Sequence, residues 1–392
     1  MINRDIIIFG GGIAGLWALR RLVDTGYDAV LIEKDKLGGD QTLASQGMIH
    51  GGQKYAITGQ VNDHARSIAA MPERWERCLN GSGDIDLSAT KILSPSQIMW
   101  PAGGMLSDMA VFAAAKLVQD DTVKLERAAW PEILKGHPHF KGSVYLMKEE
   151  VLDSKSLLAA LAAPVRSRIY KGSVSTLDQD GSVTVDNVTI RAKAIFFCAG
   201  QGNEDALRFL DINDRKTQRR PLKQVMVSSV PFPLYAHGIV GNPKPRMTIT
   251  SHPGADGGFV WYLGGDIAEK GVGLSDDEQM AFACRELQDL FPQIDWAAKD
   301  YAVWSGDRAE PFSDKGALPP GPYLHSIGNI SLGWPAKLTF APGFGDLVME
   351  RVKDLSITPT TSGEALPLPH AEIGQYPWEK ATWKKLNNAR SA

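Results

Sequence analysis

Residues 5–15 read Asp-Ile-Ile-Ile-Phe-Gly-Gly-Gly-Ile-Ala-Gly, and this stretch decides the fold of the amino-terminal part of the chain. The short apolar, β-branched run before Gly10 is typical of a buried parallel strand. Helical character continues from Leu16 to Val23, and residues 29–32 predict a second strand that ends at Glu33. The order strand, glycine-rich turn, helix and strand predicts the first unit of an α/β sheet.

The three glycines of this G-x-G-x-x-G pattern each have a physical role. Gly10 permits a tight turn, Gly12 lets a pyrophosphate approach the backbone, and Gly15 allows close packing of helix on strand. The helix N-terminus stabilises phosphate charge with its dipole and its free N–H groups. Glu33 lies 18 residues after Gly15, where a carboxylate accepts hydrogen bonds from ribose hydroxyls. The pattern predicts a dinucleotide site; the alternative is a glycine-rich turn of an unrelated sheet.

A second motif of this kind is absent from the sequence. Gly200-Gln-Gly202 and Gly343-Phe-Gly345 both lack the third glycine. A flavoenzyme that is reduced by NAD(P)H normally needs a second nucleotide domain with such a motif. We therefore expect one dinucleotide site, with electrons supplied by a small substrate.

Length, net charge and cysteine content exclude several classes of protein. With 392 residues the chain is long enough for roughly two to three domains. A net charge of −3 gives no overall field for holding nucleic acid. Three distant cysteines exclude a disulfide scaffold and a zinc finger, and no metal site is expected. The most apolar stretch, residues 6–19, is too short to span a bilayer, so the expected location is the cytoplasm.

Three later segments carry a resemblance to a known family. Residues 40–55 (DQTLASQGMIHGGQKY) follow the second predicted strand, residues 194–200 (AIFFCAG) form a later strand, and residues 332–342 (LGWPAKLTFAP) precede a predicted helix. In this order they resemble FAD-dependent oxidoreductases of the D-amino-acid-oxidase superfamily. Ser45 and the Ile49–Gly52 run resemble the glycerol-3-phosphate and 2-hydroxyglutarate dehydrogenase branch most.

The resemblance implies FAD as the cofactor and an α/β fold. A Rossmann-like FAD-binding domain would be assembled from discontinuous segments and joined to a mixed-sheet substrate domain. The expected bounds are 1–60, 151–212 and 306–355 for the FAD-binding domain, 61–150 and 213–305 for the substrate-binding domain, and 356–392 for a C-terminal tail.

Local patterns predict several further elements. Residues 151–161 predict a helix capped by Asp153 or Ser154. Residues 168–191 predict a small β-meander with turns at 178–181 and 186–187. In the second insertion, strands are expected over residues 225–230, 246–250 and 258–263, and the capping box Ser275-Asp-Asp-Glu278 opens a helix to about Phe291.

The resemblance also implies the positions that contact FAD. The turn and strand end hold the ADP part, and the last segment stabilises negative charge near flavin N1 and the C2 carbonyl. The expected cofactor-binding residues are Gly10, Gly12, Ile13, Ala14, Gly15, Glu33, Lys34, Thr42, Ala44, Ser45, Gln46, His50, Gly51, Val174, Ala199, Gly200, Lys337, Leu338 and Thr339. Cys198 is expected to be a buried strand residue beside the FAD, without thiol chemistry.

Oxidation of a C–H bond by a flavin requires a substrate anchor and a proton acceptor. Arg308, in Trp304-Ser-Gly-Asp-Arg-Ala-Glu-Pro311, resembles the family's arginine that anchors an anionic group. The sequence departs from the family's Gly-x-Arg-Pro by the insertion of Ala-Glu. The alternative is a structural ion pair, for example with Asp307 or Glu310.

Three further residues are candidates for catalysis. His50 is expected near the flavin ring as a contact or a base, the alternative being a packed histidine that holds the glycine turn. His252 ends a predicted strand, where a plain turn histidine is the alternative. Lys337 faces either the flavin or solvent. Tyr55 and Tyr262 are weaker candidates, because core aromatic residues are commoner.

Two charged segments suggest partners. Arg215, Lys216, Arg219, Arg220 and Lys223 form a basic cluster that is a solvated face, a guide for an acidic substrate, or an RNA contact. No pattern of stacking aromatic residues accompanies the cluster, so nucleic acid is not expected. In the tail, Trp378, Trp383 and Leu386 lie among lysines, which suggests a peripheral membrane anchor or a docked segment.

The sequence therefore predicts an FAD-dependent oxidase or dehydrogenase that oxidises a CH–OH or CH–NH bond of a small anionic substrate by hydride transfer to flavin N5. Oxygen or a quinone would reoxidise the flavin. The alternatives are a flavoprotein that acts on a macromolecule such as RNA through the basic cluster, and a non-catalytic flavin-binding partner protein. Assembly state and the choice between amine and hydroxy substrate stay open.

Denaturing the purified yellow protein should release FAD into the supernatant, because the predicted contacts are non-covalent. Absorption spectra and chromatography of the supernatant measure this release. Flavin that stays with the precipitate would indicate a covalent link through His50 or a cysteine. A colourless protein that cannot be reconstituted with FAD would contradict the assignment of the cofactor.

Overall fold

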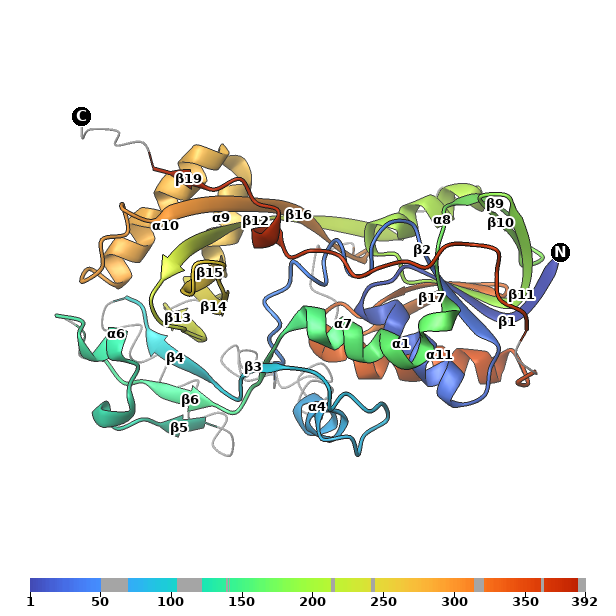
Figure 1. Cartoon of the computed structure of the whole chain (residues 1–392), viewed down its shortest axis with the longest axis horizontal. Helices are drawn as coiled ribbons and strands as arrows, with labels where there is room; N and C mark the ends of the chain where they lie inside the picture. Colours follow the sequence, from blue (N-terminus) through green and yellow to red (C-terminus); the bar gives the residue numbers. More distant parts are fainter. Residues whose placement is uncertain are drawn as a thin grey trace.

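The computed structural model describes residues 1–50, 70–103, 122–138, 140, 142–212, 216–240, 244–313, 321–360 and 363–386. The candidate positions Gly51, Tyr55 and Arg215 lie outside these ranges. The molecule is elongated, with a large sheet toward each end of its long axis (Figure 1). One sheet is mainly parallel and the other mainly antiparallel, which confirms the predicted α/β fold with a second, mixed sheet.

The first sheet has eight strands, and five consecutive strands of its main order run parallel. Since these strands come from both ends of the sequence, the sheet is assembled from discontinuous segments. In spatial order the strands are β17 (Tyr323–Ile327), β18 (Ile330–Trp334), β11 (Val188–Phe197), β1 (Ile2–Phe9), β2 (Ala29–Glu33) and β8 (Ile169–Lys171), with β10 (Ser182–Val185) and β9 (Val174–Leu177) added to β11.

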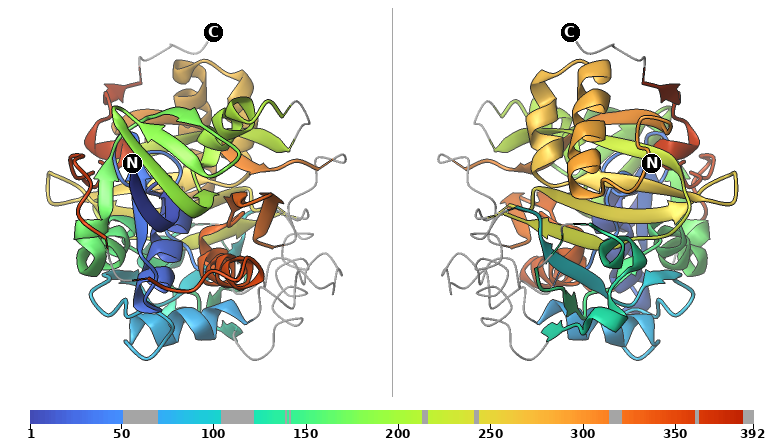
Figure 2. Two further views of the ribbon diagram at one scale, coloured as in Figure 1. Left: turned by 90° about the vertical axis from the view of Figure 1, so that its right-hand side faces the viewer. Right: turned by 90° about the vertical axis from the view of Figure 1, so that its left-hand side faces the viewer.

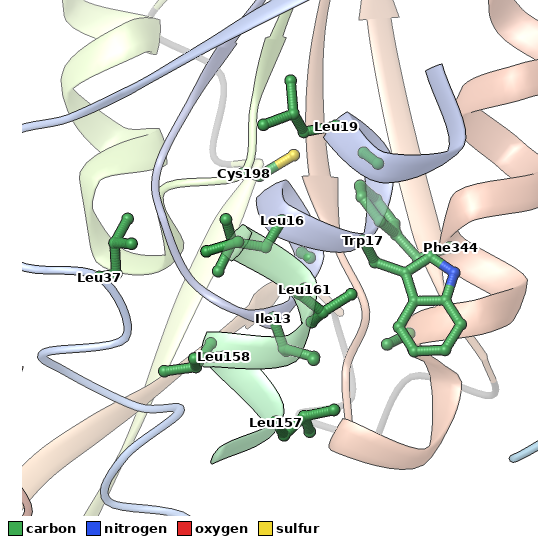
Figure 3. Close-up of a cluster of buried hydrophobic side chains, with 14 of the residues drawn as sticks. Ile13, Leu16, Trp17, Leu19, Leu37, Leu157, Leu158, Leu161, Cys198 and Phe344 are labelled. Carbon is green, nitrogen blue, oxygen red and sulfur yellow. The ribbon is translucent and has the colours of Figure 1, made fainter. Parts of the chain in front are cut away.

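Both faces of this sheet are covered, which explains the uninterrupted apolar run in β1. Ile6 and Ile8 join the core beneath helices α1 (Ile13–Asp24), α7 (Ser154–Ala162) and α11 (Ala341–Asp354). Ile7 and Phe9 point to the opposite face, where β9, β10 and α8 (Asn203–Phe209) pack. Figure 3 shows the first cluster, with Trp17 of α1 next to Phe344 of α11.

The turn between β1 and α1 is very closely packed. Gly10 has φ +104°, and a Cβ there would lie 2.5 Å from the carbonyl oxygen of Cys198 at the end of β11. A Cβ on Gly15 would overlap the carbonyl oxygen of Gly10. Both glycines are therefore needed to bring α1 onto the ends of β1 and β11, as the sequence predicts. Cys198 is buried, and burial raises the pKa of its thiol above the ordinary value, so the thiol stays protonated.

The second sheet has nine strands, and all neighbouring pairs are antiparallel except β13 with β4. Strands β12 and β16 form a long ribbon that extends toward the first sheet (Figure 1). In spatial order the strands are β19 (Lys384–Lys385), β16 (Asp300–Pro311), β12 (Thr217–Val230), β15 (Phe259–Gly264), β14 (Met247–Pro253), β13 (Ala236–Ile239), β4 (Gln97–Pro101), β6 (Tyr145–Met147) and β5 (Thr122–Lys124).

Helices α9 (Asp266–Lys270) and α10 (Asp276–Leu290) lie side by side against this sheet, as the two views of Figure 2 show. Met280, Ala283 and Leu287 of α10 pack into its core. The predicted capping box is present, with the Ser275 side chain accepting from the Glu278 N–H and the Glu278 carboxylate from the Ser275 N–H. The predicted cap of α7 is also confirmed: Asp153 accepts from the Ser156 N–H at 2.7 Å.

Shorter elements complete the described part of the chain. Strands β3 and β7 form a separate two-stranded sheet. These elements are β3 (Ile92–Ser94), β7 (Val151–Leu152), α4 (Met71–Leu79), α6 (Glu132–Lys135), and the 3₁₀ turns η1 (Arg127–Ala129), η2 (Ala163–Arg168), η3 (Gly200–Gly202), η4 (Gly271–Gly273), η5 (Leu338–Phe340) and η6 (Pro377–Glu379).

The predicted domain bounds stay a prediction, but the strands bear on one of them. The expected change of domain between residues 305 and 306 falls inside β16, which continues to Pro311 in register with β12. The Arg308 segment is therefore part of the second sheet's ribbon. The predicted bound is too early because residues 217–224 of β12 pair with this part of β16. The sequence analysis did not identify residues 217–224 as a strand.

The tail crosses the molecule and is held at several points (Figure 1). Near the first sheet, Leu37 N–H donates to Glu372 O at 2.8 Å, and Gly374 N–H donates back to Leu37 O at 3.0 Å. At the other end, β19 pairs with β16. Trp378 is buried and Trp383 packs on the core, so the side chains that would enter a membrane are used internally. Within the described ranges, no helix has the length and apolarity to cross a bilayer.

His252 lies beneath this tail in an aromatic cluster. Its ring centroid lies 4.1 Å from that of Trp378 and 5.8 Å from that of Tyr376. Neither ring nitrogen has a hydrogen-bond partner among the described residues, and the side chain is buried. Burial lowers the pKa of His252 to about 3, although the charge of Asp153 opposes the shift. His252 is therefore a neutral core residue near neutral pH.

Gly15→Ala should destabilise the protein by about 1–3 kcal/mol or more, because the new methyl group overlaps the Gly10 carbonyl oxygen. Gly273→Ala is the matched control, since a Cβ there meets nothing within 4 Å. Thermal unfolding midpoints of both variants measure the effect. Equal midpoints for Gly15→Ala and the wild type would contradict the proposed packing.

The buried His252 should make stability depend on pH. The folded protein keeps the ring neutral down to about pH 3, whereas the unfolded chain protonates it near pH 6.5. The contribution of the neutral His252 to the free energy of unfolding is therefore complete above pH 6.5 and declines as the pH falls toward 3. Between pH 7 and 5 the wild type should lose about 2 kcal/mol more than His252→Phe. Urea unfolding at both pH values tests this, and parallel losses would contradict it.

Candidate active site

The N-terminus of α1 forms a cradle for an anion at the carboxyl edge of the first sheet. The helix starts after Gly12, with no side-chain cap and no acidic residue in its first turn. Ile13 N–H donates to Thr42 Oγ1 at 3.1 Å, and a Cβ on Gly12 would lie 3.2 Å from the same oxygen. Ala14 and Gly15 continue the first turn. Backbone N–H groups at a helix start are suited to bind a pyrophosphate, so this turn is a candidate site for one.

Glu33 lies at the end of β2, next to this cradle. Its Oε2 accepts from Gly11 N–H at 2.6 Å and its Oε1 from Asp35 N–H at 3.0 Å. The carboxylate is therefore held against the glycine turn, at the position expected to bind ribose hydroxyls. Lys34 is exposed, and Val174 is half-buried at the start of β9, two strands removed from β11.

The segment from Thr42 to His50 lies between the two sheets. Ser45 Oγ donates to Thr42 O at 2.8 Å, which closes a turn beside the cradle. Gln46 Nε2 donates to Tyr262 O at 2.9 Å, and the Tyr262 hydroxyl donates to Ala44 O at 2.9 Å. These bonds fix the predicted flavin segment on β15 of the second sheet. Tyr262 is fully buried, so it is a core aromatic that positions this segment.

The N-terminus of a second helix, α11, lies close to His50 and also has no side-chain cap. Thr339 Oγ1, in η5, accepts from His50 N–H at 2.9 Å, and Trp75 Nε1 donates to Thr339 O at 2.8 Å. Helix α11 follows directly, with no acidic residue in its first turn. Lys337 and Leu338 are half-buried, and Lys337 Nζ lies 5.9 Å from the Phe340 ring centroid. This arrangement suits negative charge on a flavin pyrimidine ring.

The end of β11 is joined to the end of β18 by a residue that the sequence analysis missed. Asn203 is fully buried; its Oδ1 accepts from Ala199 N–H at 3.0 Å, and its Nδ2 donates to Gly333 O at 3.1 Å. Gly200 adopts φ +57°, a backbone conformation that glycine reaches without strain. Its place beside the cofactor stays a prediction. No motif marks Asn203, because its role depends on the pairing of two distant strands.

His50 meets two residues that the sequence analysis also missed. Its Nδ1 lies 3.5 Å from Glu149 Oε2, and its ring centroid lies 6.0 Å from that of His237. Glu149 and His237 are buried, whereas the His50 side chain keeps 25% of its surface exposed. His237 Nε2 lies 2.6 Å from Gln97 Oε1. Thus the partly exposed imidazole of His50 adjoins the buried side chains of Glu149 and His237 at the junction of the sheets.

Arg308 has a partner that differs from those expected. Its Nη2 lies 3.3 Å from Glu269 Oε1, whereas Asp307 and Glu310 lie near other arginines of the basic cluster. Burial would raise the pKa of Glu269, but Lys244 and Arg308 outweigh this effect and lower it. Nε of Arg308 is buried without a hydrogen-bond partner among the described residues. The guanidinium therefore has an unused donor beside its ion pair.

The basic cluster is neutralised at three of its described positions. Arg219 forms a bidentate pair with Glu204, Arg220 Nη1 lies 3.5 Å from Glu310, and Lys223 Nζ lies 2.9 Å from Asp276. Cations already paired with carboxylates contribute little to phosphate binding. These contacts give no support to an RNA-binding face.

Comparisons with known proteins agree with this geometry. The family model described as FAD dependent oxidoreductase (DAO) matches residues 5–351. The FAD-dependent oxidoreductase PA4991 of Pseudomonas aeruginosa is 39% identical over 386 residues, which are 97% of this chain and 98% of that protein. Its crystal structure superposes with a TM-score of 0.83 at 38% identity, over 96% of this chain and 98% of that one.

More distant solved structures share the fold. Glycine oxidase from Geobacillus kaustophilus has a TM-score of 0.67 at 17% identity, over 95% of this chain and all of that one. L-α-glycerophosphate oxidase from Mycoplasma pneumoniae, solved with FAD bound, has a TM-score of 0.66 at 15% identity, over 96% of this chain and 99% of that one.

The anion cradle, the Glu33 carboxylate and the capless start of α11 together fit the phosphate, ribose and flavin parts of FAD. The family match spans most of the chain, and the Pseudomonas relative is similar over nearly its whole length. The chain therefore belongs to the DAO family of FAD-dependent oxidoreductases and is an FAD-dependent enzyme.

Proposed function

We propose that the enzyme oxidises a CH–OH or CH–NH bond of a small anionic substrate, and that bound FAD supplies the hydride acceptor at N5 of its flavin ring. The observation that carries the proposal is the position of His50. Its backbone is fixed to the flavin-side turn at Thr339, and its partly exposed ring adjoins the buried Glu149. A base at this point is what removal of a substrate O–H or N–H proton requires.

His50 would accept the substrate proton, and Glu149 would support it. A carboxylate beside the imidazole stabilises the protonated ring and fixes its orientation. In this proposal Nδ1, 3.5 Å from Oε2, faces Glu149, and Nε2 would accept the substrate proton. The alternative of a packed histidine that only holds the glycine turn is less favoured, because a quarter of the side-chain surface is exposed.

Arg308 would anchor the anionic group of the substrate. Its guanidinium is paired with Glu269 at one nitrogen, and among the described residues its buried Nε has no hydrogen-bond partner. An arginine can hold a carboxylate or phosphate through two parallel hydrogen bonds. Lys337, half-buried at the start of η5, would contribute positive charge on the flavin side. His252 has no part in this proposal, because it is a neutral core residue.

The choice between amine and hydroxy substrate stays open, since glycine oxidase and glycerophosphate oxidase both share the fold at low identity. Oxygen or a quinone would reoxidise the flavin. Cytoplasmic location is part of the proposal. Action on RNA is less favoured, because described cations of the basic cluster are paired with carboxylates.

A panel of 2-hydroxy acids, polyol phosphates and amino acids, added without oxygen, should contain a class that bleaches the flavin absorption. With that substrate, His50→Gln should slow flavin reduction by about 10²- to 10⁴-fold, because the proton acceptor is lost. Stopped-flow absorbance measures the rate constant.

The control for this experiment is His325→Gln, on edge strand β17, which should reduce at the wild-type rate. Both variants should retain the wild-type content of FAD. Reduction of His50→Gln at the wild-type rate would contradict the role of His50 as the base.

A further inference from the structure

We propose that His50, Glu149 and His237 form a binding site for a divalent transition-metal ion. Each residue offers one ligand atom, and these atoms all lie within 4.8 Å of one another. Two imidazoles and one carboxylate make a donor set that favours zinc, iron, cobalt or manganese over magnesium or calcium. This inference goes beyond the proposed oxidation and does not depend on it; because a metal on Nδ1 of His50 leaves the proton on Nε2, His50 would act as the base in the metal-free enzyme.

The backbone brings His50 and Glu149 together. Ile49 N–H donates to Glu150 O at 2.9 Å, and Leu152 N–H donates to Gly47 O at 2.9 Å. Residues 47–49 therefore lie antiparallel to residues 150–152, which leaves His50 and Glu149 adjacent at the end of this pairing. The Thr339 hydroxyl fixes the His50 N–H from the other side.

His237 reaches the cluster from the second sheet. It lies in β13, paired with Met99 of the parallel neighbour β4, and is completely buried. The next strand, β6, ends at Met147, two residues before Glu149. Three different parts of the fold thus bring one ligand each to a single point, which is a common way to build a metal site on a rigid scaffold.

Gln97 supports the cluster in the way that outer residues support metal ligands. Its Oε1 lies 2.6 Å from His237 Nε2, and its Nε2 donates to the Glu149 carbonyl oxygen at 3.3 Å. In this arrangement His237 carries its proton on Nε2 and presents Nδ1 as the ligand atom. Gln97 is itself buried, so it can fix both ligands.

The geometry favours a metal over a single shared proton. A proton between His50 and Glu149 needs two groups, whereas the cluster holds a third nitrogen ligand that Gln97 orients. Bond lengths of about 2.0–2.2 Å place neighbouring ligand atoms roughly 3.3 Å apart. The His50–Glu149 separation of 3.5 Å already matches this spacing. Three protein ligands also leave a coordination position open, as in metal sites that bind a further oxygen ligand.

The test uses tag-free, FAD-loaded protein that has been dialysed against EDTA and then against EDTA-free buffer. Calorimetric titration with ZnCl₂ should show one equivalent bound with a Kd of about 1 μM or tighter. Glu149→Gln and His237→Asn should each weaken this binding by at least about 100-fold, because each removes a ligand. Gln97→Leu should weaken it by about 10- to 100-fold.

His325→Asn is the matched control and should bind zinc like the wild type. FAD content and circular dichroism establish that each variant is folded. If His237→Asn fails to fold, the nearly isosteric Glu149→Gln decides the result. Absence of a stoichiometric zinc site in the wild type, or equal affinity in Glu149→Gln, would overturn the proposal and leave the cluster as a hydrogen-bonded proton site. Flavin bleaching by substrate is measured on the EDTA-treated, metal-free protein, so failure of one proposal is distinguishable from failure of the other.

Discussion

The structure depends on one close approach, in which the turn after β1 packs against the end of β11. Gly10 adopts φ +104°, and the Cys198 carbonyl oxygen occupies the place where a side chain would begin. Because no side chain intervenes, α1 starts directly after this turn, close to the ends of β1 and β11. The Glu33 carboxylate, which is predicted to bind ribose hydroxyls, is then held by the same turn through the Gly11 N–H. The cofactor site follows from this packing.

The proposed catalytic region lies where the segment from Thr42 to His50 passes between the two sheets. Its hydrogen bonds to Tyr262, Thr339 and Glu150 come from three distant parts of the chain. Buried polar groups in such a place are costly unless they are satisfied, so the network that surrounds His50 also defines its position. The tail adds a further connection, since it binds the Leu37 backbone and pairs with β16.

Local patterns allowed much of the first sheet to be predicted. The glycine turn, the strand that ends at Glu33 and the two capping motifs at Asp153 and Ser275 depend on residues close in sequence, and the structure has these elements as expected. The partners of His50 could not be predicted in this way, because they depend on the pairing of β13 with β4 and of β4 with β6. The sequence analysis likewise named Asp307 or Glu310 for Arg308, which are near in sequence, whereas the partner in the structure is Glu269 of α9.

The parallel order of the first sheet has a consequence for synthesis on the ribosome. Strand β1 ends at Phe9, but its neighbour β11 ends at Phe197, and β18 ends only at Trp334. At about 5–20 residues per second, β1 would wait roughly 10–40 s for β11 to emerge. During this interval β1 has only β2 as a partner in the sheet. The nascent chain therefore exposes an unpaired strand edge that can pair with other chains. One edge of β1 thus stays unpaired in the sheet until β11 has been made.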